Sequence, residues 1–217
     1  MAEICTEIWQ GIVKRLVLYV MLTVGVADNV LVQAVTEIDN KVFVVFANSS
    51  NINVYDAETF SHLPALKVEG LENPRDIAVC RDDRQLYVAE SDCIWKVLTT
   101  DRHQYRKWLT IGSTTSGFIV ISLSLTKRRL LLTSSRSLRQ YHTTDKRVLC
   151  VVECPKYIVD MYHAIETTRG TFVVGHRCTS QDEDLFAVSV NCFLILPCTQ
   201  HIYIALHKMQ TADLLKY

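Results

Sequence analysis

Short runs of apolar, β-branched and aromatic residues alternate with clusters of charged and turn-forming residues along most of the chain. Runs of four to seven such residues, bounded by turn formers, predict short β-strands. Three successive groups of runs appear, at 30–35, 42–46, 52–55 and 66–68, then 76–80, 86–89, 93–97 and 107–111, then 118–123, 130–133, 138–141 and 148–152. The pattern predicts an all-β chain built from groups of four strands.

The groups recur with a period of about 44 residues. The apolar cores of the second runs begin at residues 42, 86, 130 and 171, at intervals of 44, 44 and 41. Each core follows a charged or Gly-containing turn, namely Asp39-Asn40, Asp83-Arg84, Lys127-Arg128 and Arg169-Gly170. An aromatic residue recurs on the third run, as Tyr55, Trp95 and Tyr141. Four strands in 40 to 45 residues is the repeat of a β-propeller blade, so we expect a β-propeller of about four four-stranded antiparallel blades, as a closed, partial or open ring.

Two phrases of the repeat resemble known propeller families. Val54-Tyr55-Asp56-Ala57-Glu58-Thr59 resembles the strand-and-turn phrase of YVTN-type repeats. Asn73-Pro74-Arg75-Asp76-Ile77-Ala78-Val79, followed by Leu86-Tyr87-Val88-Ala89, resembles the core phrase of NHL and related repeats. The resemblance covers about residues 29–175. It implies a propeller fold and says little about function, because these phrases encode turns and core packing.

The pattern divides the chain into an N-terminal apolar segment (1–28), propeller blades (29–206) and a C-terminal tail (207–217). The fourth blade loses the landmarks of the repeat beyond residue 178, where apolar runs at 186–190, 192–196 and 202–206 follow a polar acidic loop. In the first segment, Lys14-Arg15, an apolar stretch and Gly25-Val26-Ala27 imitate a secretory signal. The alternative is a strand or helix that packs on the blades.

The composition argues against recognition of some classes of partner by charge, but it does not identify a partner. Lys plus Arg and Asp plus Glu both number 23, so the neutral chain has no built-in attraction to nucleic acid, and we expect none as a partner. Membrane contact is expected only through a signal or anchor at the N-terminus. The eight cysteines include no CxxC pair, and we interpret them as buried reduced thiols, which favours the cytoplasm over secretion.

Ligands of propellers usually meet the loops at one face, around the mouth of the central channel. We therefore expect a binding site among the residues at the entrances of the inner strands and in a neighbouring turn, namely Asp28, Asn73, Arg75, Asp76, Arg136, Lys156 and Asp160. No catalytic residue and no cofactor is predicted, because the sequence has no GxSxG elbow, no GxGxxG and no phosphate-binding loop. The leading hypothesis is a non-enzymatic module that binds a protein partner, with self-association through unfinished blade edges as a further expectation.

Two alternatives stay open. Asp28, Asp76 and Asp160 could hold a cation at the channel mouth, as in lactonase-like metal-dependent hydrolases, although no Glu stands at a matching place to act as general base. A secreted or anchored extracellular propeller is the other alternative. A looser group, with Cys150, Cys154, His163, His176 and Cys178, has metal-ligating side chains, but its spacing fits buried thiols better than zinc.

Overall fold

The computed structural model describes residues 31–99, 104–111, 118–154, 158–168, 170–178 and 192–197. These residues form β1 (Val32–Ile38), β2 (Lys41–Phe46), β3 (Asn51–Asp56), β4 (His62–Lys67), β5 (Asp76–Cys80), β6 (Gln85–Ala89), β7 (Cys93–Leu98), β8 (Tyr105–Thr110), β9 (Ser122–Thr126), β10 (Arg129–Thr133), β11 (Ser137–His142), β12 (Val148–Glu153), β13 (Ile158–Glu166), β14 (Thr171–Cys178) and β15 (Cys192–Pro197). Within these ranges, no helix has the length and apolar character needed to cross a membrane.

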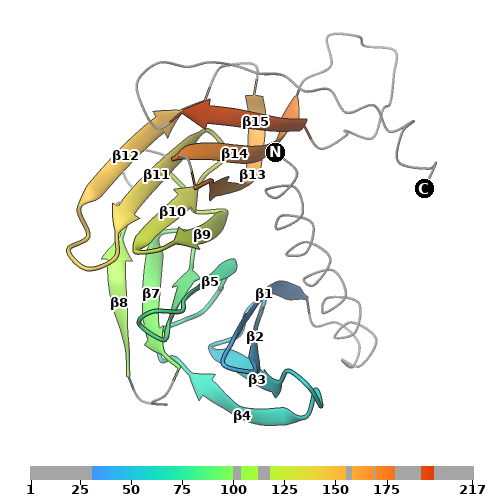
Figure 1. The fold of residues 1–217 in the computed structure, drawn as a ribbon. Coiled ribbons are helices and arrows are strands. Elements are labelled where there is room, and N and C mark those ends of the chain that lie inside the picture. Colours follow the sequence, from blue (N-terminus) through green and yellow to red (C-terminus); the bar gives the residue numbers. More distant parts are fainter. Residues whose placement is uncertain are drawn as a thin grey trace, which may run out of the picture. The chain divides into compact units, whose positions relative to one another are not determined.

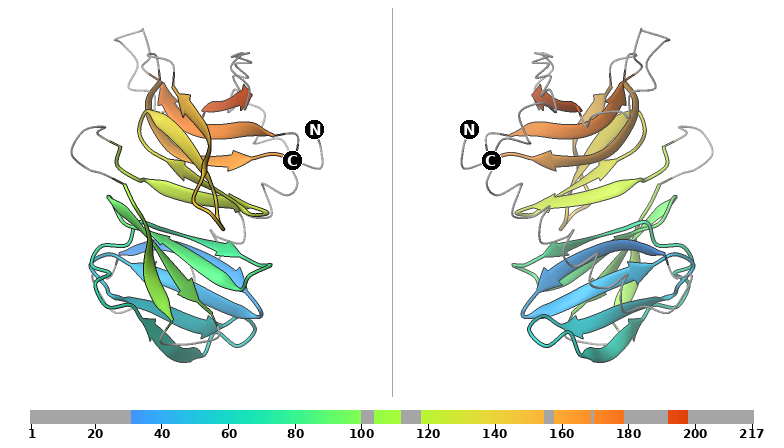
Figure 2. Two further views of the ribbon diagram at one scale, coloured as in Figure 1. Left: turned by 90° about the vertical axis from the view of Figure 1, so that its left-hand side faces the viewer. Right: turned by 90° about the vertical axis from the view of Figure 1, so that its right-hand side faces the viewer.

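The chain divides into two compact units, Met1–Ser116 and Gly117–Tyr217. The first unit contains a sheet of order β1-β2-β3-β4 and a sheet of order β5-β6-β7-β8 (Figure 1). The second unit contains a sheet of order β9-β10-β11-β12 and a three-stranded sheet of β13, β14 and β15. We call these the first to fourth sheets. Within each sheet, consecutive strands pair antiparallel, and two further views of the ribbon are shown in Figure 2.

These sheets confirm the predicted four-stranded blades in the first three repeats. The fourth repeat has three strands among the described residues, and β15 coincides with the predicted run at 192–196. The predicted segments 1–28 and 207–217, and the runs at 186–190 and 202–206, lie outside the described residues.

Tight turns after the inner strands set the register of the hairpins. Ile38 pairs with Lys41, and Asp39 and Asn40 between them have positive φ angles of 52° and 58°. Two successive residues with positive φ form a type I′ turn, whose twist matches that of the strands, and Asn and Asp tolerate this conformation well. Lys127 also has positive φ in the equivalent turn of the third sheet. The predicted hairpin positions are confirmed.

The structure corrects two details of the repeat. Tyr55 pairs with Val42, and Tyr141 pairs with Leu130, but the residue that pairs with Leu86 is Val97. Trp95 therefore lies two residues earlier in its strand than the other two aromatic residues, and the three are not equivalent.

The second correction concerns the inner strand of the third sheet. The strand predicted at 118–123 begins only at Ser122 and continues to Thr126, because the turn at Lys127 and Arg128 pairs Ser124 and Leu125 with β10. The polar Ser and Thr residues hid this end of the strand from the hydrophobic pattern.

An apolar layer joins the two sheets of the first unit. Inner strands β1 and β5 contact each other, and side chains from both sheets interdigitate. The buried members include Ile38, Phe43, Val45, Ile52, Val54, Ile77, Leu86, Val88, Cys93, Trp95 and Val97. Burial of such side chains stabilises a fold by roughly 1.5–3 kcal/mol each, so this layer accounts for much of the unit's stability.

The corresponding layer of the second unit mixes apolar and charged groups. Leu131 and Leu138 of the third sheet pack against Met161, Ala164, Phe172 and Val174 of the fourth sheet. Beside them, the buried carboxylate of Glu166 accepts a hydrogen bond of 2.8 Å from Gln140 and lies 2.9 Å from the Arg129 guanidinium. Both partners belong to the third sheet, so the carboxylate ties the two sheets together.

Candidate functional site

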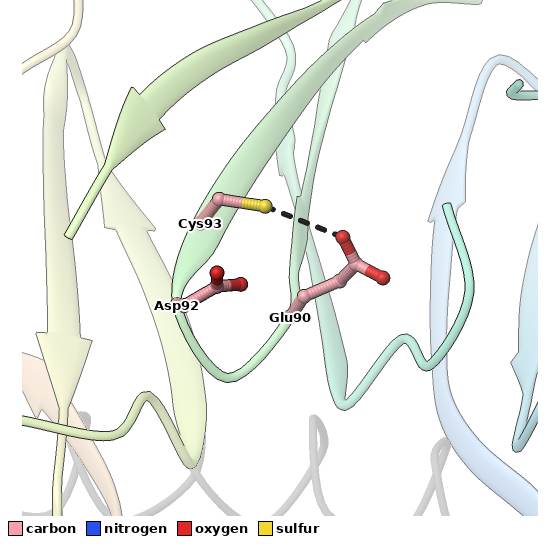
Figure 3. A group of neighbouring side chains, drawn as sticks. All are labelled: Glu90, Asp92 and Cys93. Carbon is pink, nitrogen blue, oxygen red and sulfur yellow. Dashed lines mark hydrogen bonds between the residues drawn. The ribbon is translucent and has the colours of Figure 1, made fainter. Parts of the chain in front are cut away.

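The turn between β6 and β7 carries a buried carboxylate that organises one end of the second sheet. Glu90 follows the apolar strand β6 directly and is only 8% exposed. Its backbone N–H donates to the carbonyl of Cys93 at 2.9 Å, which closes the turn. Figure 3 shows the Glu90 and Cys93 side chains pointing toward each other across this turn, where the Cys93 thiol donates to Oε2 at 3.2 Å.

Three further donors complete the coordination of this carboxylate. Oε1 accepts the backbone N–H groups of Glu72 and Asn73 at 2.8 and 3.0 Å. Oε2 also accepts the indole N–H of Trp95 at 2.7 Å. Glu90 therefore links three parts of the sheet: the β4–β5 connection, the β6–β7 turn and the side chain of Trp95. We call this arrangement the Glu90 latch.

The electrostatics of the latch favour an ionised carboxylate beside a protonated thiol. Burial alone would raise the pKa of Glu90, but the hydrogen bonds from Asn73, Trp95, Glu72 and Cys93 outweigh it, and the pKa lies below its ordinary value. Burial, with the charge and hydrogen bond of Glu90, raises the pKa of Cys93 to about 12. The thiol is therefore a donor to Glu90 at neutral pH and a poor nucleophile.

Glu90, Asp92 and Cys93 are also the group of potential metal ligands that the described residues bring together, with one ligand atom of each within 4.8 Å of the others. The chemistry of this group fits the latch better than a metal centre. An ionised carboxylate offers about four acceptor positions, and four donors already take those of Glu90. A metal ion would have to displace N–H groups that are buried or partly buried and deprotonate Cys93, and each of these steps costs free energy.

The β4–β5 connection must come close to the Trp95 ring to reach the latch. Gly70 has a positive φ of 85°, and a Cβ atom on it would lie 3.2 Å from the Trp95 ring. A side chain at this position would face both backbone strain and crowding, which is why a glycine suits it. The connection then presents Glu72, Asn73 and Arg75 as exposed side chains, beside the exposed Asp92 of the turn.

Three of the predicted site residues belong to this region. The Asn73 N–H binds the latch, and the Arg75 N–H donates to the carbonyl of Ala89 at 2.8 Å, while both side chains are exposed. Asp76 is instead buried at the start of β5, where Oδ1 accepts the N–H of Ile77 at 2.8 Å. The sequence prediction missed Glu90, which gives no repeat signal because Phe46 and Ser134 stand 44 residues before and after it.

The second unit holds two more of the predicted residues near one another. The carbonyl of Ser135 accepts the N–H of Met161 at 3.1 Å, so the turn that carries Arg136 lies beside the strand that carries Asp160. The carbonyl of Arg136 also accepts the N–H of Cys154 at 2.8 Å, while its side chain is exposed. Asp28 and Lys156 lie outside the described residues.

The β10–β11 turn of the second unit is closed differently from the β6–β7 turn. The Ser134 hydroxyl donates to the carbonyl of Ser137 at 2.9 Å and accepts the Ser137 N–H at 3.0 Å. The turn therefore satisfies itself with hydroxyls, whereas the β6–β7 turn uses a carboxylate that also holds the neighbouring connection.

A shallow pocket of about 140 Å³ lies at the opposite ends of the strands in the first unit. It is lined by Ile38, Asp39, Lys41, Phe43, Arg84 and Thr99, and Arg84 forms an ion pair of 3.0 Å with Asp39 at its rim. Sites for small organic ligands usually occupy roughly 300–1,000 Å³, so this pocket is too small to be one of them.

No protein-family model and no curated protein matches the sequence. Among solved structures, the chain resembles hydrazine synthase of Kuenenia stuttgartiensis with a TM-score of 0.56 and 13% identity, over 84% of this chain and 67% of the other. It resembles a chain of a nidogen/laminin complex with a TM-score of 0.55 and 13% identity, over 76% of this chain and 60% of the other. The present chain thus spans less than two thirds of that second protein chain.

Both solved structures are β-propeller proteins, and the likeness at this level of identity concerns the fold alone. Together with the antiparallel four-stranded sheets, it shows that the chain has a β-propeller fold.

Proposed function

We propose that this chain is a non-enzymatic interaction module that binds a protein partner through the loops at the latch end of its blades. The observation that carries the proposal is the Glu90 latch. Through hydrogen bonds to the N–H groups of Glu72 and Asn73, it fixes the backbone of the β4–β5 connection. It leaves the side chains of Glu72, Asn73 and Arg75 exposed. A loop held in one conformation loses less entropy when it binds, so it makes a better recognition surface than a mobile one.

The chemistry of the exposed side chains suits recognition of a polar protein surface. Arg75 is the cation of this loop, and Glu69, Glu72 and Asp92 are exposed acidic residues around it. In the second unit, Arg136 and Asp160 form a separate candidate surface. Asp28 and Lys156 lie outside the described residues and stay members predicted from the sequence. The turn and core phrases of the sequence resemble those of NHL and YVTN-type propellers, and this resemblance supports a repeat of that type as part of the same proposal.

The test is a quantitative affinity capture with two matched variants. The first variant, Asn73→Ala with Arg75→Ala, removes two exposed side chains of the proposed surface and keeps the backbone bonds to Glu90 and Ala89. The control, Lys41→Ala with Lys127→Ala, removes exposed side chains at the opposite ends of the strands. We expect the wild type and the control to capture the same partner protein in equal amounts and the first variant to capture little of it. Direct binding is then measured with the purified partner. Equal retention by all three forms would contradict the proposal.

A further inference from the structure

The outer strand of the third sheet differs from the outer strands of the first two sheets. β4 reads His-Leu-Pro-Ala-Leu-Lys, and its Pro64 is exposed and lacks an N–H group. β8 carries the exposed charges of Arg106 and Lys107. Proline and charged side chains are the usual protections of an edge strand against pairing with another chain. β12 reads Val-Leu-Cys-Val-Val-Glu and has neither protection before its last residue.

The backbone of β12 offers hydrogen-bonding groups away from its own sheet. Cys154 donates to the carbonyl of Arg136, so in an antiparallel ladder the alternate residues Val151 and Glu153 point their N–H and C=O groups outward. On the other side of the register shift, His142 donates to the carbonyl of Arg147, which directs the groups of Val148 outward as well. In the part of the chain that the structure describes, no strand lies beyond β12.

The side chains of this edge are apolar in the middle and oppositely charged at the two ends. Val148 and Val151 are 49% and 52% exposed, which is high for valine. Lys146 and Arg147 lie exposed before the strand, and Glu153 lies exposed at its end. A second copy of the same strand, running antiparallel, therefore places Glu153 of each copy near the basic end of the other.

We propose that β12 is a self-association edge, at which two copies of this chain pair through their β12 strands around a two-fold axis. The charges select the register in which Val148 of each copy lies opposite Val151 of the other and the oppositely charged ends face one another. In this register, outward backbone groups of both strands form hydrogen bonds and the exposed valines are covered. The two-fold symmetry brings Glu153 near the basic end of the other strand twice, once in each copy. The paired area is small, so the dimer is weak and forms in a concentration-dependent way.

The test measures self-association of the purified full chain by sedimentation velocity over a wide range of concentration. We expect a reversible monomer–dimer equilibrium for the wild type. Val151→Lys puts a charge in the centre of the edge of both copies and is expected to raise the dimer dissociation constant roughly tenfold or more. Ile119→Lys is the matched control, because Ile119 is 51% exposed and lies outside any strand, and it should leave the dimer unchanged. Circular dichroism checks that both variants keep their β content.

A charge exchange tests the orientation independently of the apolar contacts. Glu153→Lys alone should weaken the dimer, and the combination with Lys146→Glu and Arg147→Glu should restore it, since antiparallel strands bring these ends together. A strictly monomeric wild type, an unchanged dimer in the folded Val151→Lys variant or equal disruption by Ile119→Lys would overturn the proposal. A monomeric wild type would leave the edge to a strand from a different protein.

Discussion

The two units use a buried carboxylate in different places. In the first unit, Glu90 lies at the rim of one sheet and binds a loop, while the layer between the sheets is apolar. In the second unit, Glu166 lies in the layer between the sheets, where Gln140 and Arg129 bind it. The first unit therefore obtains its cohesion from packing and uses charge to shape a loop, whereas the second unit uses charge to join its sheets. The two units should respond differently when these groups are changed.

We expect the largest loss of stability when Trp95 is replaced, because its side chain belongs to both the apolar layer and the latch. Trp95→Ala removes a side chain that is 5% exposed and should lower the free energy of unfolding by roughly 3–5 kcal/mol. Trp95→Phe keeps most of the packing but removes the donor to Glu90, and should cost roughly 1–3 kcal/mol. Chemical denaturation measures both. Equal losses for the two variants would mean that packing of the indole contributes nothing beyond its hydrogen bond.

We expect the second largest loss of stability when Glu166 is changed, because this residue joins the two sheets of the second unit. Glu166→Ala leaves the buried amide of Gln140 without this acceptor and opens space between the sheets, so we expect a loss of roughly 2–3 kcal/mol. Arg129 is partly exposed, and water can solvate it, so it adds little to this cost. The exposed Glu153→Ala is the control, measured at low protein concentration, and should change stability by less than about 0.5 kcal/mol. A similar small change for Glu166→Ala would contradict the role of this carboxylate between the sheets.

Glu90→Gln should cost less, roughly 1–2 kcal/mol, because the amide keeps the shape of the side chain but turns an acceptor into a donor. The effect should depend on pH. Since hydrogen bonds hold the pKa of folded Glu90 below its ordinary value, the carboxylate contributes stability above the pKa of the unfolded chain, about 4.3. This contribution is lost as the pH falls through the lower folded pKa. The difference in unfolding free energy between wild type and variant should therefore shrink on acidification, while Asp92→Asn serves as the exposed control. A pH-independent difference would be the contrary outcome.

The smallest effect is expected at the exposed β3–β4 turn. Asp56 Oδ1 accepts the N–H groups of Glu58 and Thr59 and the Thr59 hydroxyl, and these bonds lower the pKa of Asp56. Asp56→Ala should reduce the melting temperature by less than any change above, because water can replace the lost acceptor. Glu58→Ala, which removes a neighbouring charge without touching the turn bonds, should leave the melting temperature unchanged. A larger loss for Glu58 than for Asp56 would show that charge, and not the turn, matters here.

Sequence reasoning found the repeat because its signals are local. The Asp39-Asn40 turn and the apolar strand that follows it can both be identified from residue types alone. The position of Trp95 within the repeat could not be identified in this way, because its register depends on how β7 pairs with β6. Glu90 was missed for a related reason: its four donors come from Glu72, Asn73, Cys93 and Trp95, which only the folded loops bring together. Asn73 and Arg75 were predicted as site residues because they belong to a recognisable phrase, and their role in binding stays a prediction.

Amide hydrogen exchange at Asn73 tests the central claim most directly, which is that Glu90 holds the proposed recognition loop in place. We predict that the N–H groups of Glu72 and Asn73 exchange slowly in the wild-type protein, although both residues have exposed side chains. In Glu90→Ala, which removes both acceptor oxygens, these two amides should lose their protection while the β6 amides, such as that of Val88, keep theirs. Fast exchange of both amides in the wild type, or unchanged protection in the variant, would contradict the account.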